Sequence, residues 1–177
     1  GEGAVDRAIY FATVLGVDMG MFYKRRDYST IVNGKNPIVA HEFLGDNIDG
    51  KDIVIIDDMI SSGGSMLDTA RQLKQMNARR VFICCTFGLF TDGLSAFDRA
   101  YEQGYFDKVV TTDLTYLPPE IYDKPYFVEV DMSKFVASMI DFINHDVSLS
   151  NVLATTEKIH GILEAYNSRA NVEAFSN

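Results

Sequence analysis

The chain has 177 residues, of which 47% are hydrophobic and 23% charged, proportions that are ordinary for one globular domain and that exclude a disordered or fibrous protein. Its 25 acidic residues outnumber its 16 basic residues, and the resulting net charge of −9 opposes binding to nucleic acid and to anionic membranes. The cysteines Cys84 and Cys85 are adjacent in an apolar run, so we expect them to be reduced thiols. No membrane span or signal peptide is recognised, and we expect a cytoplasmic protein.

The first part of the chain predicts a helix, a strand and a loop. Apolar residues recur at helical spacing over residues 4–15. Residues 17–23 predict a strand, which the basic tripeptide Lys24-Arg25-Arg26 is expected to end. The stretch up to residue 37 is rich in Ser, Thr, Asn and Gly and is expected to form a mobile loop before the next apolar run, residues 38–44.

A strand, a loop and a helix follow. The β-branched run at residues 53–56 predicts a strand buried on both faces, which the pair Asp57-Asp58 should end. Ser61-Ser62-Gly63-Gly64-Ser65 has the composition of a loop, and helical spacing resumes over residues 66–76.

The rest of the chain repeats this alternation. Strands are expected at residues 80–87, 108–112 and 126–130, and helices near residues 95–103, 134–144 and 156–166. Alternating strands and helices predict an α/β fold with a mostly parallel sheet flanked by helices, in one domain spanning residues 1–177.

The loop after the third predicted strand has the chemistry of a phosphate site. Ligands of an open parallel sheet bind where strands end and helices begin, next to the positive ends of the helices. Gly63 and Gly64 allow the backbone to approach an anion, and Ser61, Ser62 and Ser65 add hydroxyl donors. The lysine of a Walker A motif is missing after Gly64, so a monophosphate is the expected ligand group.

The acidic pair before this loop indicates that the ligand also carries hydroxyl groups. Asp57 and Asp58 would repel a bare polyphosphate, but they can accept hydrogen bonds from hydroxyl groups. A sugar phosphate supplies both the hydroxyl groups and the phosphate group.

Interpretations without a function are a solvated strand end for the acidic pair and a solvated surface for Lys24-Arg25-Arg26. The scattered histidines His41, His145 and His160 predict structural roles and no metal site.

Residues 53–65, Ile-Val-Ile-Ile-Asp-Asp-Met-Ile-Ser-Ser-Gly-Gly-Ser, resemble the phosphoribosyl-binding motif of type I phosphoribosyltransferases and their relatives. The resemblance implies that Asp57 and Asp58 bind the 2- and 3-hydroxyls of ribose while Ser61, Ser62, Gly63, Gly64 and Ser65 wrap its 5-phosphate. Within that superfamily nearly the whole chain resembles ribose-phosphate pyrophosphokinase, through Arg7-Ala8, Lys24-Arg25-Arg26, Gly45-Asp46 and Gly50-Lys51.

This second resemblance implies an enzyme that transfers diphosphate from ATP to the 1-hydroxyl of ribose 5-phosphate, with Mg²⁺ as cofactor and with Lys24 and Arg26 stabilising the transferring group. It implies that the chain is the C-terminal part of a longer two-domain enzyme that assembles into dimers or hexamers and that the part alone is inactive. Many members carry Asp-Thr where this chain has Ser61-Ser62. Two alternatives stay open: a phosphoribosyltransferase that consumes the product, and a non-catalytic regulatory subunit that binds sugar phosphate.

Overall fold

The computed structural model describes residues 2–26, 38–145, 148, 150 and 154–174, and the side chains of residues 8–22, 43–145, 148, 150 and 154–170. In chain order, the elements are α1 (Glu2–Leu15), β1 (Met21–Arg26), β2 (Ile38–Leu44), β3 (Asp52–Ile60), α2 (Gly64–Gln75), β4 (Arg80–Gly88), α3 (Ser95–Glu102), β5 (Lys108–Thr112), the 3₁₀ helix η1 (Pro119–Asp123), β6 (Phe127–Val130), α4 (Ser133–Asn144) and α6 (Thr155–Ala174).

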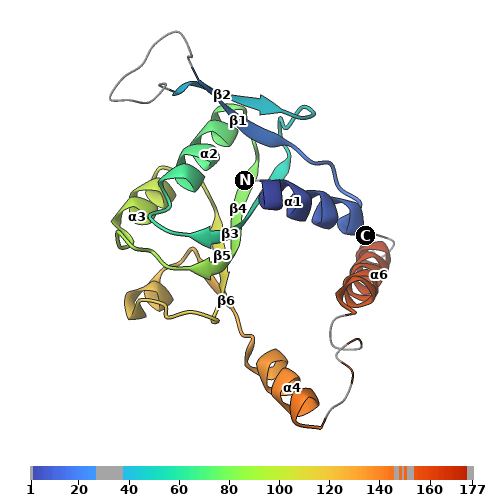
Figure 1. The fold of residues 1–177 in the computed structure, drawn as a ribbon. Helices are drawn as coiled ribbons and strands as arrows, with labels where there is room; N and C mark the ends of the chain where they lie inside the picture. The colour runs from blue at the N-terminus through green and yellow to red at the C-terminus, as the bar shows by residue number, and fades with distance from the viewer. Residues whose placement is uncertain (1, 27–37, 146–147, 149, 151–153, 175–177) are drawn as a thin grey trace.

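A four-stranded sheet in the order β3-β4-β5-β6 forms the centre of the molecule, and β1 and β2 form a separate two-stranded sheet (Figure 1). All neighbouring strands of the four-stranded sheet are parallel, so the predicted α/β fold is confirmed. α2 joins β3 to β4, α3 joins β4 to β5, and both helices lie on the same side of the sheet (Figure 1). This arrangement brings the carboxyl ends of the strands to one edge, which is where parallel sheets bind ligands.

The hydrophobic core lies between this sheet and the two helices. From Val81 to Cys85 of β4 every second residue is buried, namely Val81, Ile83 and Cys85, while the residues between them are partly exposed. α3 contributes Phe97, which is fully buried and contacts the rings of Phe90 and Phe106 at centroid distances of 5.2 and 6.2 Å. One face of the sheet is therefore covered much more completely than the other.

β3 differs from the predicted strand in length and in burial. Its pairing with β4 continues to Ile60, opposite Gly88, so Asp57 and Asp58 lie within the strand and do not end it. The expected burial on both faces is wrong, because Val54 is 55% exposed. β3 is the first strand in the sheet order, so among the described residues it has a neighbouring strand on one side only.

The first strand is shifted relative to its prediction. β1 pairs antiparallel with β2 from Met21 to Arg26, with Lys24 opposite His41. The prediction that the basic tripeptide ends the strand is wrong, because the ladder with β2 carries the extended backbone through it. The loop predicted to end at residue 37 falls on residues 27–37, which lie outside the described residues.

The last two predicted helices are present, and α6 is longer than predicted. α4, described over its full length, has no buried residue, and its apolar side chains Phe135, Val136, Ile140 and Ile143 are exposed. α6 lies against α1, where the hydroxyl groups of Tyr10 and Thr156 are 2.7 Å apart. Among the described helices, none is both long enough and apolar enough to cross a membrane.

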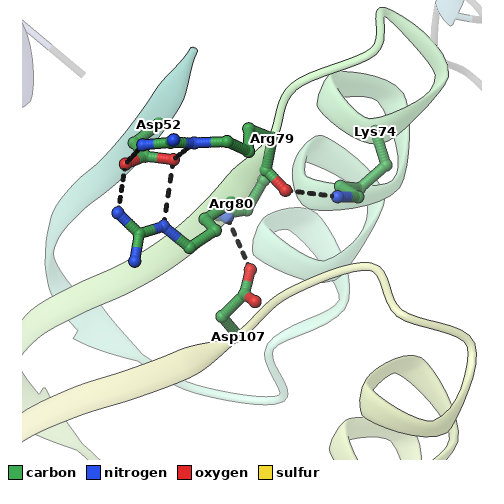
Figure 2. Close-up of polar contacts among 6 residues, drawn as sticks. Asp52, Lys74, Arg79, Arg80 and Asp107 are labelled. Carbon is green, nitrogen blue, oxygen red and sulfur yellow. Dashed lines mark hydrogen bonds and ion pairs between the residues drawn. The ribbon is translucent and has the colours of Figure 1, made fainter. Parts of the chain in front are cut away.

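Charged side chains join the strands at the amino edge of the sheet, opposite the candidate ligand edge (Figure 2). Asp52 accepts hydrogen bonds from Arg79 at 2.8 and 2.6 Å and from Arg80 at 3.1 and 2.5 Å. These bonds, from Arg79 first and then Arg80, hold the pKa of the Asp52 carboxyl well below its ordinary value. Asp107 accepts from a backbone N–H of β4 at 2.8 Å, and Lys74 donates to the carbonyl of Arg79 at 2.8 Å. The starts of β3, β4 and β5 are thus tied together.

We predict that Asp52→Asn lowers the melting temperature, because two adjacent arginines lose their shared ionised acceptor. The folded-state pKa of Asp52 lies below the unfolded value of about 3.9, so its contribution to stability is complete above that pH and is lost as the pH falls through the folded-state pKa. The difference in melting temperature, followed by circular dichroism, should be constant from about pH 5 to 8 and should shrink below about pH 4.

The matched control is Asp123→Asn, which removes the same charge from an exposed position in η1 and should leave the melting temperature unchanged. Identical melting temperatures for Asp52→Asn and wild type at pH 7 would show that the two ion pairs contribute nothing.

Candidate functional site

The candidate site lies at the carboxyl edge of the sheet, where β3 passes into α2. Ser61 and Ser62 form an exposed bend after the strand, and Gly63 behind them is buried. α2 begins at Gly64, two residues before the predicted start at Met66. Gly64 and Ser65 therefore belong to the first helical turn, and the 61–65 loop is shorter than its sequence suggests.

Gly63 is held in a conformation that other residues adopt only with strain. Its φ is +84°, in the left-handed region, and it occupies the N-cap position of α2. A Cβ atom at this position would collide with the ring of Phe97, which is fully buried in the core. Gly64, in contrast, has only the Ser62 hydroxyl near its absent Cβ, at 3.9 Å. Gly63 is therefore required by core packing and backbone conformation, whereas Gly64 leaves open space at the start of α2.

The start of α2 is well suited to an anion. The first bond of the helix runs from the Leu67 N–H to the Gly63 carbonyl at 2.9 Å, so the preceding N–H groups have no acceptor within the helix. Within the described residues, no side chain caps α2 and no acidic residue lies in its first turn. Asp68, in the second turn, binds Arg71 at 2.5 Å and Gln72 at 2.7 Å. The positive end of the helix dipole thus faces the bend without a neutralising carboxylate of its own.

The two acidic residues precede this bend on β3. Asp57 is half-buried, Asp58 is exposed, and the Asp58 N–H donates to Oδ1 of Asp57 at 2.8 Å. Carboxylate oxygens accept hydrogen bonds only, which suits them to hydroxyl groups of a ligand whose anionic group binds the helix start.

A thiol lies beside the acidic pair but is not activated. Cys85 of β4 is the register partner of Asp57, and burial above all raises the pKa of its thiol to about 11, with the charges of Asp57 and Asp58 acting in the same direction. A thiol with such a pKa stays protonated near pH 7 and is a poor nucleophile. Cys84 and Cys85 are both free cysteines, as predicted.

The structure places Asp57, Asp58 and the 61–65 loop in one continuous segment of the carboxyl edge. The backbone of Lys24 and Arg26 lies in β1 of the two-stranded sheet, and their side chains lie outside the described residues.

In the part of the chain that is described, no group of three or more His, Cys, Asp or Glu residues could hold a metal ion. His145 is the C-cap residue of α4, and its Nδ1 is 2.9 Å from the carbonyl oxygen of Asp141.

Sequence reasoning missed the residues that support the 61–65 loop from the turn after β4 and from α3. The Thr91 N–H donates to the carbonyl of Ser61 at 3.0 Å, and the hydroxyl groups of these two residues are 3.4 Å apart. Phe97 lies under Gly63. Both contacts join residues thirty or more positions apart, and such contacts leave no periodic signal in the sequence.

The sequence of residues 2–112 matches the phosphoribosyl transferase domain family. The chain therefore belongs to the phosphoribosyl transferase domain family. Within the family, it is similar to ribose-phosphate pyrophosphokinases. The Vibrio cholerae protein of that name is 30% identical over 149 residues, which cover 84% of this chain and 44% of the relative. The one from Corynebacterium glutamicum is 40% identical over 111 residues, covering 63% of this chain and 32% of the relative.

A solved structure shows the same fold. The crystal structure of phosphoribosylpyrophosphate synthetase from Mycobacterium smegmatis matches with a TM-score of 0.64 and 21% sequence identity, over 81% of this chain and 43% of that protein. The chain thus spans less than half the length of these relatives.

We predict that Gly63→Ala destabilises the fold by about 2 kcal/mol or more, because alanine is strained at this φ and its methyl group displaces a buried ring. Gly64→Ala should change the free energy of unfolding by less than about 1 kcal/mol, since the position is open and helical. Urea denaturation followed by fluorescence or circular dichroism measures both. Equal effects of the two substitutions would contradict the support of the loop by Phe97.

Proposed function

We propose that this chain carries the ribose-5-phosphate site of a ribose-phosphate diphosphokinase, which transfers the diphosphate group of ATP to the 1-hydroxyl of ribose 5-phosphate. The observation that carries the proposal is the direct succession of two carboxylates on β3 and an uncapped helix start at α2. The names of the relatives, ribose-phosphate pyrophosphokinase, support the same activity.

In this proposal the two halves of the site bind the two ends of the sugar phosphate. The 5-phosphate binds the first-turn N–H groups of α2 and the hydroxyl groups of Ser61, Ser62 and Ser65, with the exposed Gly64 allowing close approach and the buried Gly63 shaping the loop. Asp57 and Asp58 accept hydrogen bonds from the 2- and 3-hydroxyls. An acidic chain can hold an anion in this way because backbone dipoles act locally, where they outweigh the distant net charge of −9.

The reaction proposed for the complete enzyme is an in-line displacement. The oxygen of the 1-hydroxyl attacks the β-phosphorus of ATP, the bond from that phosphorus to the oxygen bridging it to the α-phosphorus breaks, AMP leaves, and the hydroxyl proton is lost. The protein contributes mainly position and charge stabilisation in such a transfer. We assign charge stabilisation at the transferring diphosphate to Lys24 and Arg26.

Mg²⁺ fits this proposal as a companion of the nucleotide. Mg²⁺ is commonly held by substrate phosphates, water and one or two carboxylates, so it does not require the cluster of three protein ligands that the described residues lack. Asp57 or Asp58 could supply such a carboxylate. Bound there, the ion would neutralise charge on the phosphates.

We further propose that the chain is the C-terminal part of a longer two-domain enzyme that forms dimers or hexamers in the cytoplasm. The relatives are more than twice as long as the segments that match. In that case the 177-residue chain binds ribose 5-phosphate but does not form AMP by itself.

Asp57→Asn and Asp58→Asn should each weaken ribose 5-phosphate binding roughly tenfold or more, because each replaces the ionised acceptor of a hydroxyl group. Isothermal titration calorimetry on the 177-residue chain measures the affinities. Glu102→Gln, which removes an exposed charge at the end of α3, should leave the affinity unchanged. Wild-type affinity in both Asp variants would rule out the hydroxyl-binding role.

In the longer enzyme, Lys24→Ala should lower kcat at least ~10²-fold with a much smaller change in KM, since it removes charge stabilisation that matters most in the transition state. Steady-state formation of AMP is the measurement, and Lys158→Ala in α6 is the control for loss of a surface lysine. A kcat near that of the wild type would remove the role of Lys24 and would favour the phosphoribosyltransferase alternative.

A further inference from the structure

The turn after β4 contains a backbone conformation that is unusual for its residue type. Phe90 has a φ of +47°, in the left-handed region, although it is neither glycine nor asparagine. Its side chain is 4% exposed, and its carbonyl accepts from the Gly93 N–H at 2.9 Å, which closes a turn. Strained conformations of this kind persist only where the surrounding structure imposes them.

The residues on either side of Phe90 show what imposes it. The Leu89 N–H donates to the carbonyl of Ile60 at 2.8 Å, and the Thr91 N–H donates to the carbonyl of Ser61 at 3.0 Å. The β3–β4 pairing ends at Ile60 and Gly88, so these two bonds continue the contact beyond the sheet and onto the first residue of the 61–65 loop. The kink at Phe90 allows both N–H groups to reach consecutive carbonyls.

The ring of Phe90 is connected to the same loop through Phe97. It contacts the ring of Phe97 edge-on, with centroids 5.2 Å apart and planes at 74°. Phe97 in turn lies against the Cα of Gly63. The Phe90 ring also lies under Gly88, where an added Cβ would be 2.6 Å from Cε2 of Phe90. Residues 89–91 therefore support the loop at two points: Ser61 through the backbone, and Gly63 through the edge-on contact of Phe90 with Phe97.

We propose that residues 89–91 act as a brace that sets the geometry of the 61–65 loop for the phosphate group of its ligand, with Phe90 and Thr91 as positioning residues. The proposal rests on the proposed function in one respect, that the group bound by the loop is a phosphate. An anion bound by several N–H groups requires them to converge on one point, and small displacements of the loop would weaken all of those bonds together.

The brace predicts a specific difference between two core substitutions. Phe90→Leu removes a ring that contacts Phe97, whereas Tyr126→Leu removes a ring of the same core, 1% exposed, whose ring contacts are with Tyr101 and Phe106. Both should destabilise the fold. Only Phe90→Leu should lower the affinity for ribose 5-phosphate, by about 5- to 20-fold, while Tyr126→Leu should stay within about twofold of wild type.

Titration calorimetry at a temperature where both variants are folded measures the affinities, and amide NMR spectra locate the cause. In wild type the amide signals of Gly64 and Ser65 should shift on addition of inorganic phosphate or ribose 5-phosphate, and these shifts should be reduced in Phe90→Leu. Equal affinities for Phe90→Leu and wild type, or equal losses of affinity in both variants, would contradict the proposal that residues 89–91 position the loop.

A second measurement needs no substitution and keeps the proposal testable if Phe90→Leu does not fold. Because coupling between two sites is reciprocal, ligand binding at the loop should slow hydrogen exchange of the Leu89 and Thr91 amides more than that of the amides in β6. Uniform slowing would overturn the brace. If wild type binds inorganic phosphate at the loop but not ribose 5-phosphate, the proposed function fails while the brace can still be tested with phosphate alone.

Discussion

The contact between Gly63 and the ring of Phe97 is the constraint on which the candidate site depends. It leaves no room for a Cβ atom and coincides with a left-handed backbone, so two independent requirements select glycine at one position. Phe97 is fully buried and fixed by other aromatic rings. The position of the loop is therefore determined by packing in the core, and Gly64 and Ser65 at the start of α2 are exposed to solvent.

The two edges of the four-stranded sheet handle charge in opposite ways. At the amino edge, Asp52 is matched by Arg79 and Arg80, and ionised groups satisfy each other within the protein. At the carboxyl edge, the dipole of α2 has no acidic residue in its first turn among the described residues. An anion supplied from outside can complete that arrangement, whereas the charged groups at the amino edge already pair with one another.

The acidic pair limits which anions suit this edge. Two carboxylates directly before the helix start, in a chain with a net charge of −9, disfavour a ligand that presents charge along its whole length. They favour one that places its anionic group at the helix and its hydroxyl groups at β3. Ribose 5-phosphate meets both conditions, and so does the phosphoribosyl group handled by transferases of the same family. The chemistry that separates these enzymes therefore depends on residues beyond this pair, and we propose Lys24 and Arg26 for that role.

The sequence by itself determined the order of strands and helices, the parallel sheet, and the place of the acidic pair and glycine loop at its edge, because these follow from local periodicity and from residue types. The predicted ends of two strands were wrong because pairing with a neighbouring strand decides where a strand ends. Pairing with β2 extends β1 through Lys24-Arg25-Arg26, and pairing with β4 extends β3 past Asp57 and Asp58. The predicted burial of β3 on both faces was also wrong, because Val54 is exposed. The different roles of the two glycines, and the support of the loop by Phe90, Thr91 and Phe97, were decided by the tertiary structure alone. These contacts join segments about thirty residues apart, and they form only when the sheet and helices have packed, so no local pattern in the sequence encodes them.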